Sequence, residues 1–137
     1  MLHLKIDRAF KLMLTAPIPL WMALYWHQGT EVRLDLGLLI IMAVMYPVVE
    51  EFLFRGIIQP IIAKKTSTNI YSLSLANIIT SIIFAITHLI NHDPLWAAAT
   101  ILPSLLFGFC LDRYKTLQAP IALHCYYNAG YFLLTGM

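Results

Sequence analysis

The chain has 137 residues, of which 60% are hydrophobic and 12% are charged, and its formal net charge is +2. A soluble domain has about 45–50% apolar and about 25% charged residues. This composition excludes a soluble globular domain, because a chain of this length cannot bury so much apolar surface. The net charge is too small to suggest nucleic-acid binding, so we expect no nucleic-acid partner. We predict a single integral membrane domain over residues 1–137, with membrane lipid as its surroundings.

The first apolar segment runs from about Phe10 to Trp26 and follows several basic residues, an arrangement that resembles a signal peptide. No small-x-small cleavage pattern follows the segment, and aromatic residues close it, as they do at a membrane interface. We therefore expect a retained membrane helix. Pro17 and Pro19 predict that this helix is kinked or broken.

Four further apolar segments follow the first. The second, from about Leu36 to Ala63, is long for one span of about 20 residues, and Pro47 predicts either one kinked, tilted helix or two pieces. The others run from about Ile70 to Ile90, from about Leu95 to Leu111, and from about Ala119 to the C-terminus. The predicted fold is all-α: a polytopic transmembrane helix bundle with about five membrane segments and Pro-kinked or broken helices.

The basic residues are distributed unevenly over the loops between these segments. With five spans, seven basic residues lie on the side of the N-terminus, and only Arg33 lies on the opposite side. The seven are Lys5, Arg8, Lys11, Lys64, Lys65, Arg113 and Lys115. Cytoplasmic loops carry such an excess of Lys and Arg. We therefore predict a multi-pass protein of the cell membrane, of the prokaryotic inner membrane, with its N-terminus in the cytoplasm and its C-terminus outside.

The second segment contains the ionisable residues Glu50, Glu51 and Arg55, and ionisable residues inside a membrane segment indicate function. At about 100° per residue, Arg55 lies about 40° from Glu51 but about 140° from Glu50. Glu51 and Arg55 therefore form an i,i+4 pair, whereas Glu50 has no partner in its own helix. A carboxylate next to water in such a pocket suits a general base. Alternatively, all three residues form one structural ion network.

His88, at the end of the third segment, is the second candidate site residue. Asn77, Ser81 and Phe84 share its helical face, and Thr80 lies close by. Such a polar stripe is expected to face the interior of a membrane bundle. The alternative is that His88 is a core histidine whose hydrogen bonds are satisfied.

His124 and Asn128 form the third candidate site, because their i,i+4 spacing places an imidazole and an amide on one face of the last segment. Two donors that converge on one point make an oxyanion pocket. The alternative is a hydrogen-bonded pair that joins two helices. In a straight, upright bundle, His88 and His124 would differ in depth by roughly 10–15 Å. One shared site therefore requires tilted, broken or partly re-entrant helices.

These motifs resemble, in order and spacing, those of the CPBP family: the type II CAAX prenyl endopeptidases and their bacteriocin-processing or immunity relatives, also called the ABI family. The three motifs are Glu50-Glu51-x-x-x-Arg55, Phe84-x-x-x-His88 and His124-x-x-x-Asn128. The flanking matches are Pro47-Val48-Val49, Phe54-Arg55-Gly56 and Ala119-Pro120-Ile121. The resemblance covers a motif-bearing core from about Leu38 to Tyr131.

The resemblance implies an all-α membrane bundle that carries out glutamate-dependent intramembrane proteolysis. The catalytic residues that it implies are Glu50, His88, His124 and Asn128, with Glu51, Arg55 and Phe84 in support. By this resemblance Glu50 is the base that activates water and His88 its partner in positioning that water. The same resemblance makes His124 and Asn128 the oxyanion stabilisers.

The implied substrate is a membrane-associated or lipidated protein or peptide, cleaved at a C-terminal tail, an anchor or a leader. It would enter laterally from lipid or from the aqueous side. Some relatives are linked to bacteriocin immunity, so a non-catalytic immunity or peptide-binding membrane protein is the alternative. The sequence leaves the oligomeric state open.

A zinc metalloprotease is a further alternative. His88 and His92 have the spacing of metal ligands, and His124 with Glu50 would complete four zinc ligands. However, Leu89 occupies the position that the glutamate of a His-Glu-x-x-His sequence would take. We therefore expect no cofactor and no metal.

Covalent catalysis has weaker support in the sequence. No Gly-x-Ser sequence is present, which argues against a serine protease of the rhomboid kind. Cys125 is adjacent to His124, but neighbours in a helix point about 100° apart. We expect Cys110 and Cys125 to be small buried residues.

Overall fold

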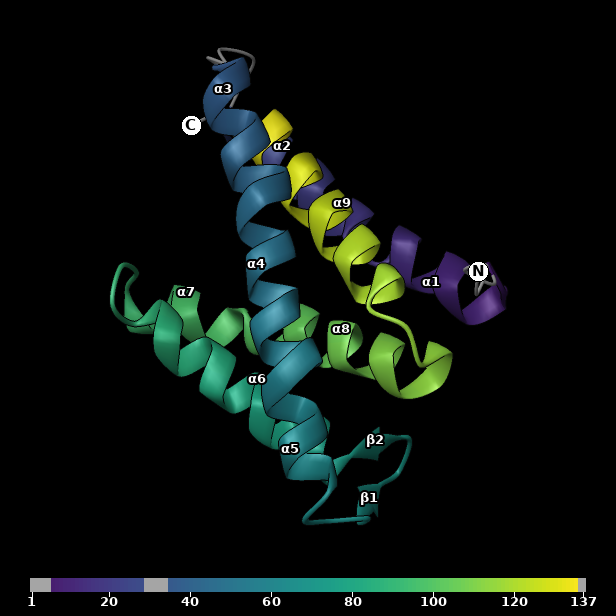
Figure 1. The fold of residues 1–137 in the computed structure, drawn as a ribbon. Coiled ribbons are helices and arrows are strands. Elements are labelled where there is room, and N and C mark those ends of the chain that lie inside the picture. Colours follow the sequence, from purple (N-terminus) through teal and green to yellow (C-terminus); the bar gives the residue numbers. More distant parts are fainter. Residues whose placement is uncertain (1–5, 29–34, 136–137) are drawn as a thin grey trace.

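The computed structural model describes residues 6–28 and 35–135, which form helices and one two-stranded hairpin (Figure 1). The helices are α1 (Arg8–Thr15), α2 (Ile18–Gln28), α3 (Leu36–Ile40), α4 (Tyr46–Leu53), α5 (Gln59–Ala63), α6 (Leu75–His88), α7 (Pro94–Ala99), α8 (Ile101–Tyr114) and α9 (Gln118–Thr135). Two π-helical turns, η1 (Ile41–Met45) and η2 (Phe54–Ile58), join α3 to α4 and α4 to α5. The strands β1 (Asn69–Ile70) and β2 (Leu73–Ser74) pair antiparallel. The all-α prediction is confirmed, whereas Lys5 and Arg33 of the predicted charge pattern lie outside the described residues.

The long helix Leu36–Ala63 is one continuous helical run with two widened turns. Each π turn ends two residues before a proline, Pro47 after η1 and Pro60 after η2. A proline has no N–H, and its ring clashes with the carbonyl one turn back, so a local π turn accommodates it without ending the helix. Of the two predicted forms, a single run and two pieces, the structure has the single run.

The predicted third segment begins too early. Residues 69–74 form the β1–β2 hairpin, and α6 starts only at Leu75. Tyr71 adopts a left-handed conformation with φ 55°, which an α-helix does not allow. The hydroxyl of Ser74 then accepts a hydrogen bond from the N–H of Asn77 and caps α6. The predicted segment ran through this turn because it was drawn from hydrophobicity alone.

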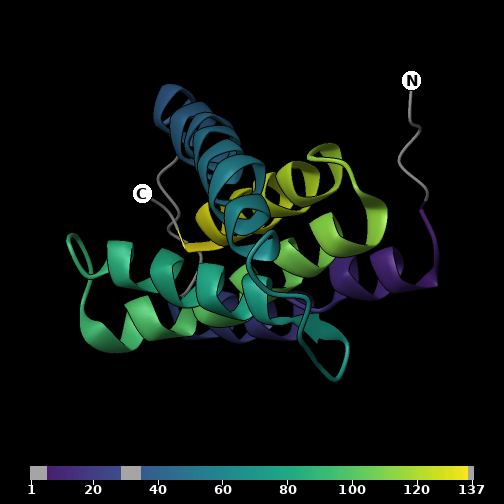
Figure 2. The ribbon, with the colours of Figure 1, turned by 60° about the horizontal axis from the view of Figure 1, so that its bottom comes forward.

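Two helical runs are long and apolar enough to cross a membrane, Leu36–Ala63 and Pro94–Tyr114. Together with the composition they describe a membrane protein, while five spans and the direction of the termini stay predictions. In Figures 1 and 2, α1, the hairpin and the α8–α9 turn lie toward one end of the molecule. The start of α3, the turn after α6 and the end of α9 lie toward the other end.

Asp7 links the start of α1 to the end of α8 through hydrogen bonds. Its carboxylate accepts hydrogen bonds from the hydroxyl of Tyr114 at 2.6 Å, from the N–H of Phe10 at 3.0 Å and from the guanidinium of Arg113 at 2.7 Å. These donors, led by Tyr114, hold the pKa of the Asp7 carboxyl well below its usual range. The same carboxylate is therefore both a helix cap and a link between helices.

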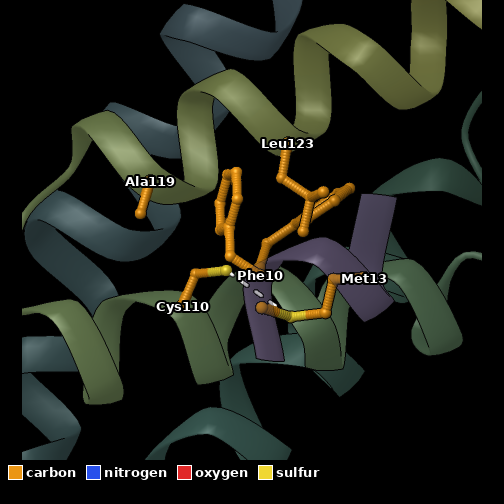
Figure 3. Packing of buried hydrophobic residues seen from close by; sticks show 6 residues of the cluster. Phe10, Met13, Cys110, Ala119 and Leu123 are labelled. Carbon is orange, nitrogen blue, oxygen red and sulfur yellow. Dashed lines mark hydrogen bonds between the residues drawn. The ribbon is translucent and has the colours of Figure 1, made fainter. Parts of the chain in front are cut away.

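A small hydrophobic core forms where α1, α8 and α9 meet (Figure 3). Its members are Phe10, Met13, Phe107, Cys110, Ala119 and Leu123. The thiol of Cys110 lies 3.7 Å from the sulfur of Met13, so this cysteine is buried as predicted. Cys125 is only half-buried, contrary to the prediction, because it lies on the side of α9 away from this core.

α6 and α8 approach each other closely at Gly108. A Cβ atom there would lie 1.8 Å from the side-chain oxygen of Asn77, so only glycine fits. The amide of Asn77 donates to the carbonyl of Leu105, and the amide of Gln59 donates to that of Gly108. The helix pair beneath the long helix is therefore fixed by buried polar contacts, as is common in membrane bundles.

Candidate active site

The two acids of α4 occupy different environments. The side chain of Glu51 is fully buried, and Arg55 donates a hydrogen bond to it at 3.1 Å. The side chain of Glu50 is 30% exposed. The i,i+4 ion pair expected from the sequence is therefore present, and Glu50 is the acid that a water molecule or a substrate can reach.

Arg55 is also fully buried, and its contacts compensate its charge. Besides Glu51, its guanidinium donates to the carbonyl and the hydroxyl of Ser104, at 2.7 and 2.6 Å. Three aromatic rings surround it at 5.2–6.0 Å: Phe54, Phe84 and Phe107. A buried charge is tolerated when it is paired and surrounded in this way.

His124 lies between the two carboxylates. Its Nδ1 is 2.8 Å from Oε1 of Glu51, and its Nε2 is 3.6 Å from Oε2 of Glu50. The ring stacks on Phe107 at 4.4 Å. Because the carboxylate of Glu51 accepts, Nδ1 carries a proton, and Nε2 is directed at Glu50. The sequence left Glu50 without a partner in its own helix, and the structure supplies one from α9.

His88 and His124 contact the same aromatic ring. Phe84 lies 4.4 Å from the His88 ring and 6.0 Å from the His124 ring, between ring centres. Nδ1 of half-buried His88 donates to the carbonyl of Phe84 at 2.9 Å, which leaves its Nε2 as the acceptor. The depth difference of an upright bundle therefore does not separate them in this fold.

A second aromatic group flanks His88, and sequence analysis missed it. The ring of His92 stacks on Trp96 at 3.9 Å, and both rings lie within about 6 Å of His88. The i,i+4 spacing of His88, His92 and Trp96 is compatible with this stack. It could not be interpreted as one helical face, because α6 ends at His88 and α7 begins only at Pro94.

Asn128 does not share a partner with His124. Its amide nitrogen donates to the carbonyl of Met42 in η1 at 3.0 Å. The two side chains lie on one face of α9, as predicted, but they contact different parts of the long helix. The convergence on one point that the spacing suggested is therefore not visible in their hydrogen bonds.

The predicted polar stripe of α6 is divided between two surroundings. Asn77, Thr80 and Ser81 are fully buried, and the hydroxyl of Ser81 donates to the Asn77 amide oxygen. Asn77 in turn contacts α8 rather than α4. The stripe faces the interior, as expected, but only its last members, Phe84 and His88, reach the site, where the Phe84 ring contacts both imidazoles.

Within residues 6–28 and 35–135, no group of three or more His, Cys, Asp or Glu side chains is placed to hold a metal ion. Cys125 is half-buried, and the two nitrogens of His124 face carboxylates rather than this thiol. The site is therefore a partly exposed carboxylate with the imidazole of His124 beside it, a second imidazole across the Phe84 ring, and a buried ion pair next to them.

The sequence matches a known family. Residues 32–130 match the family described as type II CAAX prenyl endopeptidase Rce1-like. Comparisons with curated proteins and with solved structures gave no match.

Proposed function

Because the chain belongs to the type II CAAX prenyl endopeptidase family, we propose that it is an intramembrane endopeptidase in which Glu50 activates the hydrolytic water. The observation that carries the proposal is the contrast between the two acids. Glu51 is enclosed by Arg55 and His124, whereas Glu50 is 30% exposed and lies 3.6 Å from His124. A general base must reach the proton that it removes, and Glu50 meets this condition.

The proposed reaction has two proton transfers. Glu50 removes a proton from water, and the water oxygen attacks the carbonyl carbon of the scissile peptide bond. The carbonyl oxygen becomes an oxyanion. In this step both nitrogens of His124 carry a proton: Nδ1 donates to the carboxylate of Glu51 and Nε2 donates to the oxyanion, with the Asn128 amide as a second donor. When the carbon–nitrogen bond breaks, the proton on Glu50 moves to the leaving amine. Nε2 of His88 accepts from the same water and orients it.

In this proposal Glu51 and Arg55 hold the imidazole rather than take part in the chemistry. The Glu51 carboxylate accepts from Nδ1 of His124, and Arg55 balances the charge of Glu51. A hydrogen bond at Nδ1 sets the orientation of the ring and keeps Nε2 toward the reacting atoms. Phe84 separates and supports the two imidazoles from α6.

The proposed substrate is a membrane-associated or lipidated protein or peptide. Side chains beside Glu50 on α4 are apolar and exposed, among them Val49 and Phe52 at 61% each. In a membrane such a surface contacts lipid. This supports a lateral route to Glu50 for a C-terminal tail, an anchor or a leader that is itself held in the membrane.

The first test distinguishes the reaction classes in purified protein reconstituted into vesicles. A prenylated peptide with a C-terminal CAAX sequence is the probe, and product is measured by mass spectrometry. We expect cleavage to persist in excess chelator, and the Cys125→Ser variant to stay within about twofold of wild type, since neither a metal nor this thiol takes part.

Two outcomes of this test contradict the proposal. Loss of cleavage in chelator, restored by zinc, would indicate the metalloprotease. A Cys125→Ser variant that is folded and inactive would indicate a thiol nucleophile.

A further inference from the structure

One backbone carbonyl of the long helix, that of Met42, receives no hydrogen bond from the backbone N–H groups one turn further along the helix. In η1 the N–H of Tyr46 donates to the carbonyl of Ile41. The next residue, Pro47, has no N–H, so it cannot donate one turn back. The carbonyl of Met42 would accept from the N–H of Tyr46 in an α turn and from the N–H of residue 47 in a π turn. The first N–H is bound to Ile41 and the second is absent, so neither reaches Met42. A carbonyl that is shielded from water and has no donor is costly, and the half-buried Met42 carbonyl lies in an apolar segment, so a donor from another group stabilises it.

Asn128 supplies that donor from α9. Its Nδ2 lies 3.0 Å from the Met42 carbonyl oxygen. A carbonyl only accepts, so the amide nitrogen must face Met42 and the amide oxygen must point away. One N–H of the amide is used in this bond, and the second remains for another acceptor. The contact therefore fixes which way the Asn128 amide is turned.

The contact also lies directly beside the candidate site. Pro47 precedes Glu50 and Glu51 by about one turn of the same helix run, and Asn128 follows His124 by one turn of α9. α9 packs against both η1 and α4 along this length. The Asn128–Met42 bond and the His124–carboxylate contacts thus join the same two helices at neighbouring levels.

We propose that the Met42 carbonyl, which Pro47 leaves free, is a positioning group: it orients the Asn128 amide and sets the register of α9 against the long helix, so that the second N–H of Asn128 faces the reacting carbonyl. This inference rests on the proposed function for its catalytic consequence. The hydrogen bond itself does not depend on that function, so the two can be tested apart.

The test is a double-mutant cycle with Pro47→Ala and Asn128→Ala. Alanine at position 47 restores a backbone N–H and allows η1 to tighten into an α turn. The Met42 carbonyl would then accept a hydrogen bond from the backbone of its own helix. We expect Pro47→Ala to lower kcat by about 10- to 100-fold with KM little changed, because an oxyanion donor loses its orientation. Val48→Ala, a neighbouring truncation that leaves the backbone N–H pattern unchanged, is the matched control.

The coupling within the cycle is the decisive readout. Asn128→Ala is expected to lower kcat by about 10²-fold in the wild-type background, but by less than about threefold in the Pro47→Ala background. Two full, additive losses would overturn the positioning role. So would a Pro47→Ala enzyme with wild-type kcat.

Thermal unfolding of the same four proteins separates this inference from the proposed function. We expect Asn128→Ala to lower Tm when Pro47 is present, since Met42 then has no donor, and to lower it much less when residue 47 is alanine. Coupling in Tm without coupling in kcat would mean that the bond only stabilises the fold, and would overturn the positioning role. If no variant and no wild-type protein cleaves any probe, the proposed function fails, while the Tm cycle still decides the contact.

Discussion

The Glu50→Gln variant is expected to lose about 10²–10⁴-fold in kcat while it keeps the fold of the wild type. Glutamine preserves the shape of the side chain and keeps an oxygen about as far from His124 as the carboxylate oxygen at 3.6 Å, but it cannot remove a proton from water. The side chain is 30% exposed, so the change leaves no buried charge unpaired. Cleavage of the prenylated probe and thermal unfolding in the same detergent measure both effects.

Glu51→Gln is the matched control, because it makes the same chemical change one residue away. Glu51 is fully buried between Arg55 and His124, so its neutralisation leaves the Arg55 charge uncompensated. We expect this variant to unfold at lower temperature as well as to lose activity. Wild-type cleavage by Glu50→Gln would contradict the account. Unchanged biological activity in Glu50→Gln without any cleavage would favour a peptide-binding or immunity protein.

Arg55→Met is expected to lower the free energy of unfolding by about 3–5 kcal/mol. The side chain of Arg55 is fully buried, and it donates to Glu51 and to both oxygens of Ser104. Methionine fills a similar volume but leaves the carboxylate of Glu51 buried without its cation. Breaking one partner of a buried pair is costly because the remaining charge has no water to solvate it. Denaturant unfolding in micelles measures the difference.

Two further variants make the Arg55 prediction specific. Lys64→Met removes an exposed cation at the end of the same helix run and is expected to change stability by less than about 0.5 kcal/mol. The double variant Arg55→Met, Glu51→Leu removes both charges and is expected to recover much of the loss. Equal stability of Arg55→Met and Lys64→Met would show that the buried pair contributes nothing.

Local geometry explains what the sequence could predict. The Glu51–Arg55 pair follows from i,i+4 spacing on one helix, and the helix itself supplies the geometry. The split between Glu51 and Glu50 follows in the same way, because consecutive residues of a helix point about 100° apart. The all-α class followed from composition and from long apolar segments, since a membrane admits few other structures.

Contacts between helices could not be predicted in the same way. His124 was expected to face a reacting oxygen together with Asn128, a role that stays a prediction. The contacts of His124 with Glu50 and Glu51, and that of Asn128 with Met42, were not predicted. Which side chain of one helix meets which of another depends on tilt and on the rotation of each helix about its axis. The spacing of residues along the sequence determines neither the tilt nor the rotation of a helix.

The two π turns are a feature that an upright bundle of regular α-helices leaves out. A π turn adds a residue to one turn of the helix and so rotates everything after it. Pro47 and Pro60 were visible in the sequence, but they predicted a kink or a break rather than two widened turns in one unbroken run. This rotation, together with the shared Phe84 ring, is compatible with His88 and His124 bordering one site.

The central claim is that the carboxylate of Glu50 acts on water, and chemical rescue tests it most directly. Glu50→Ala removes the base and leaves a space that is open to small molecules, because the original side chain is 30% exposed. Glu51→Ala leaves a space that is closed, because that side chain is fully buried. The measurement is the rate of probe cleavage by both variants as formate is added. The account predicts a saturable recovery in Glu50→Ala and none in Glu51→Ala; a folded Glu50→Ala protein that cleaves at the wild-type rate without formate, or that does not recover with it, would contradict it.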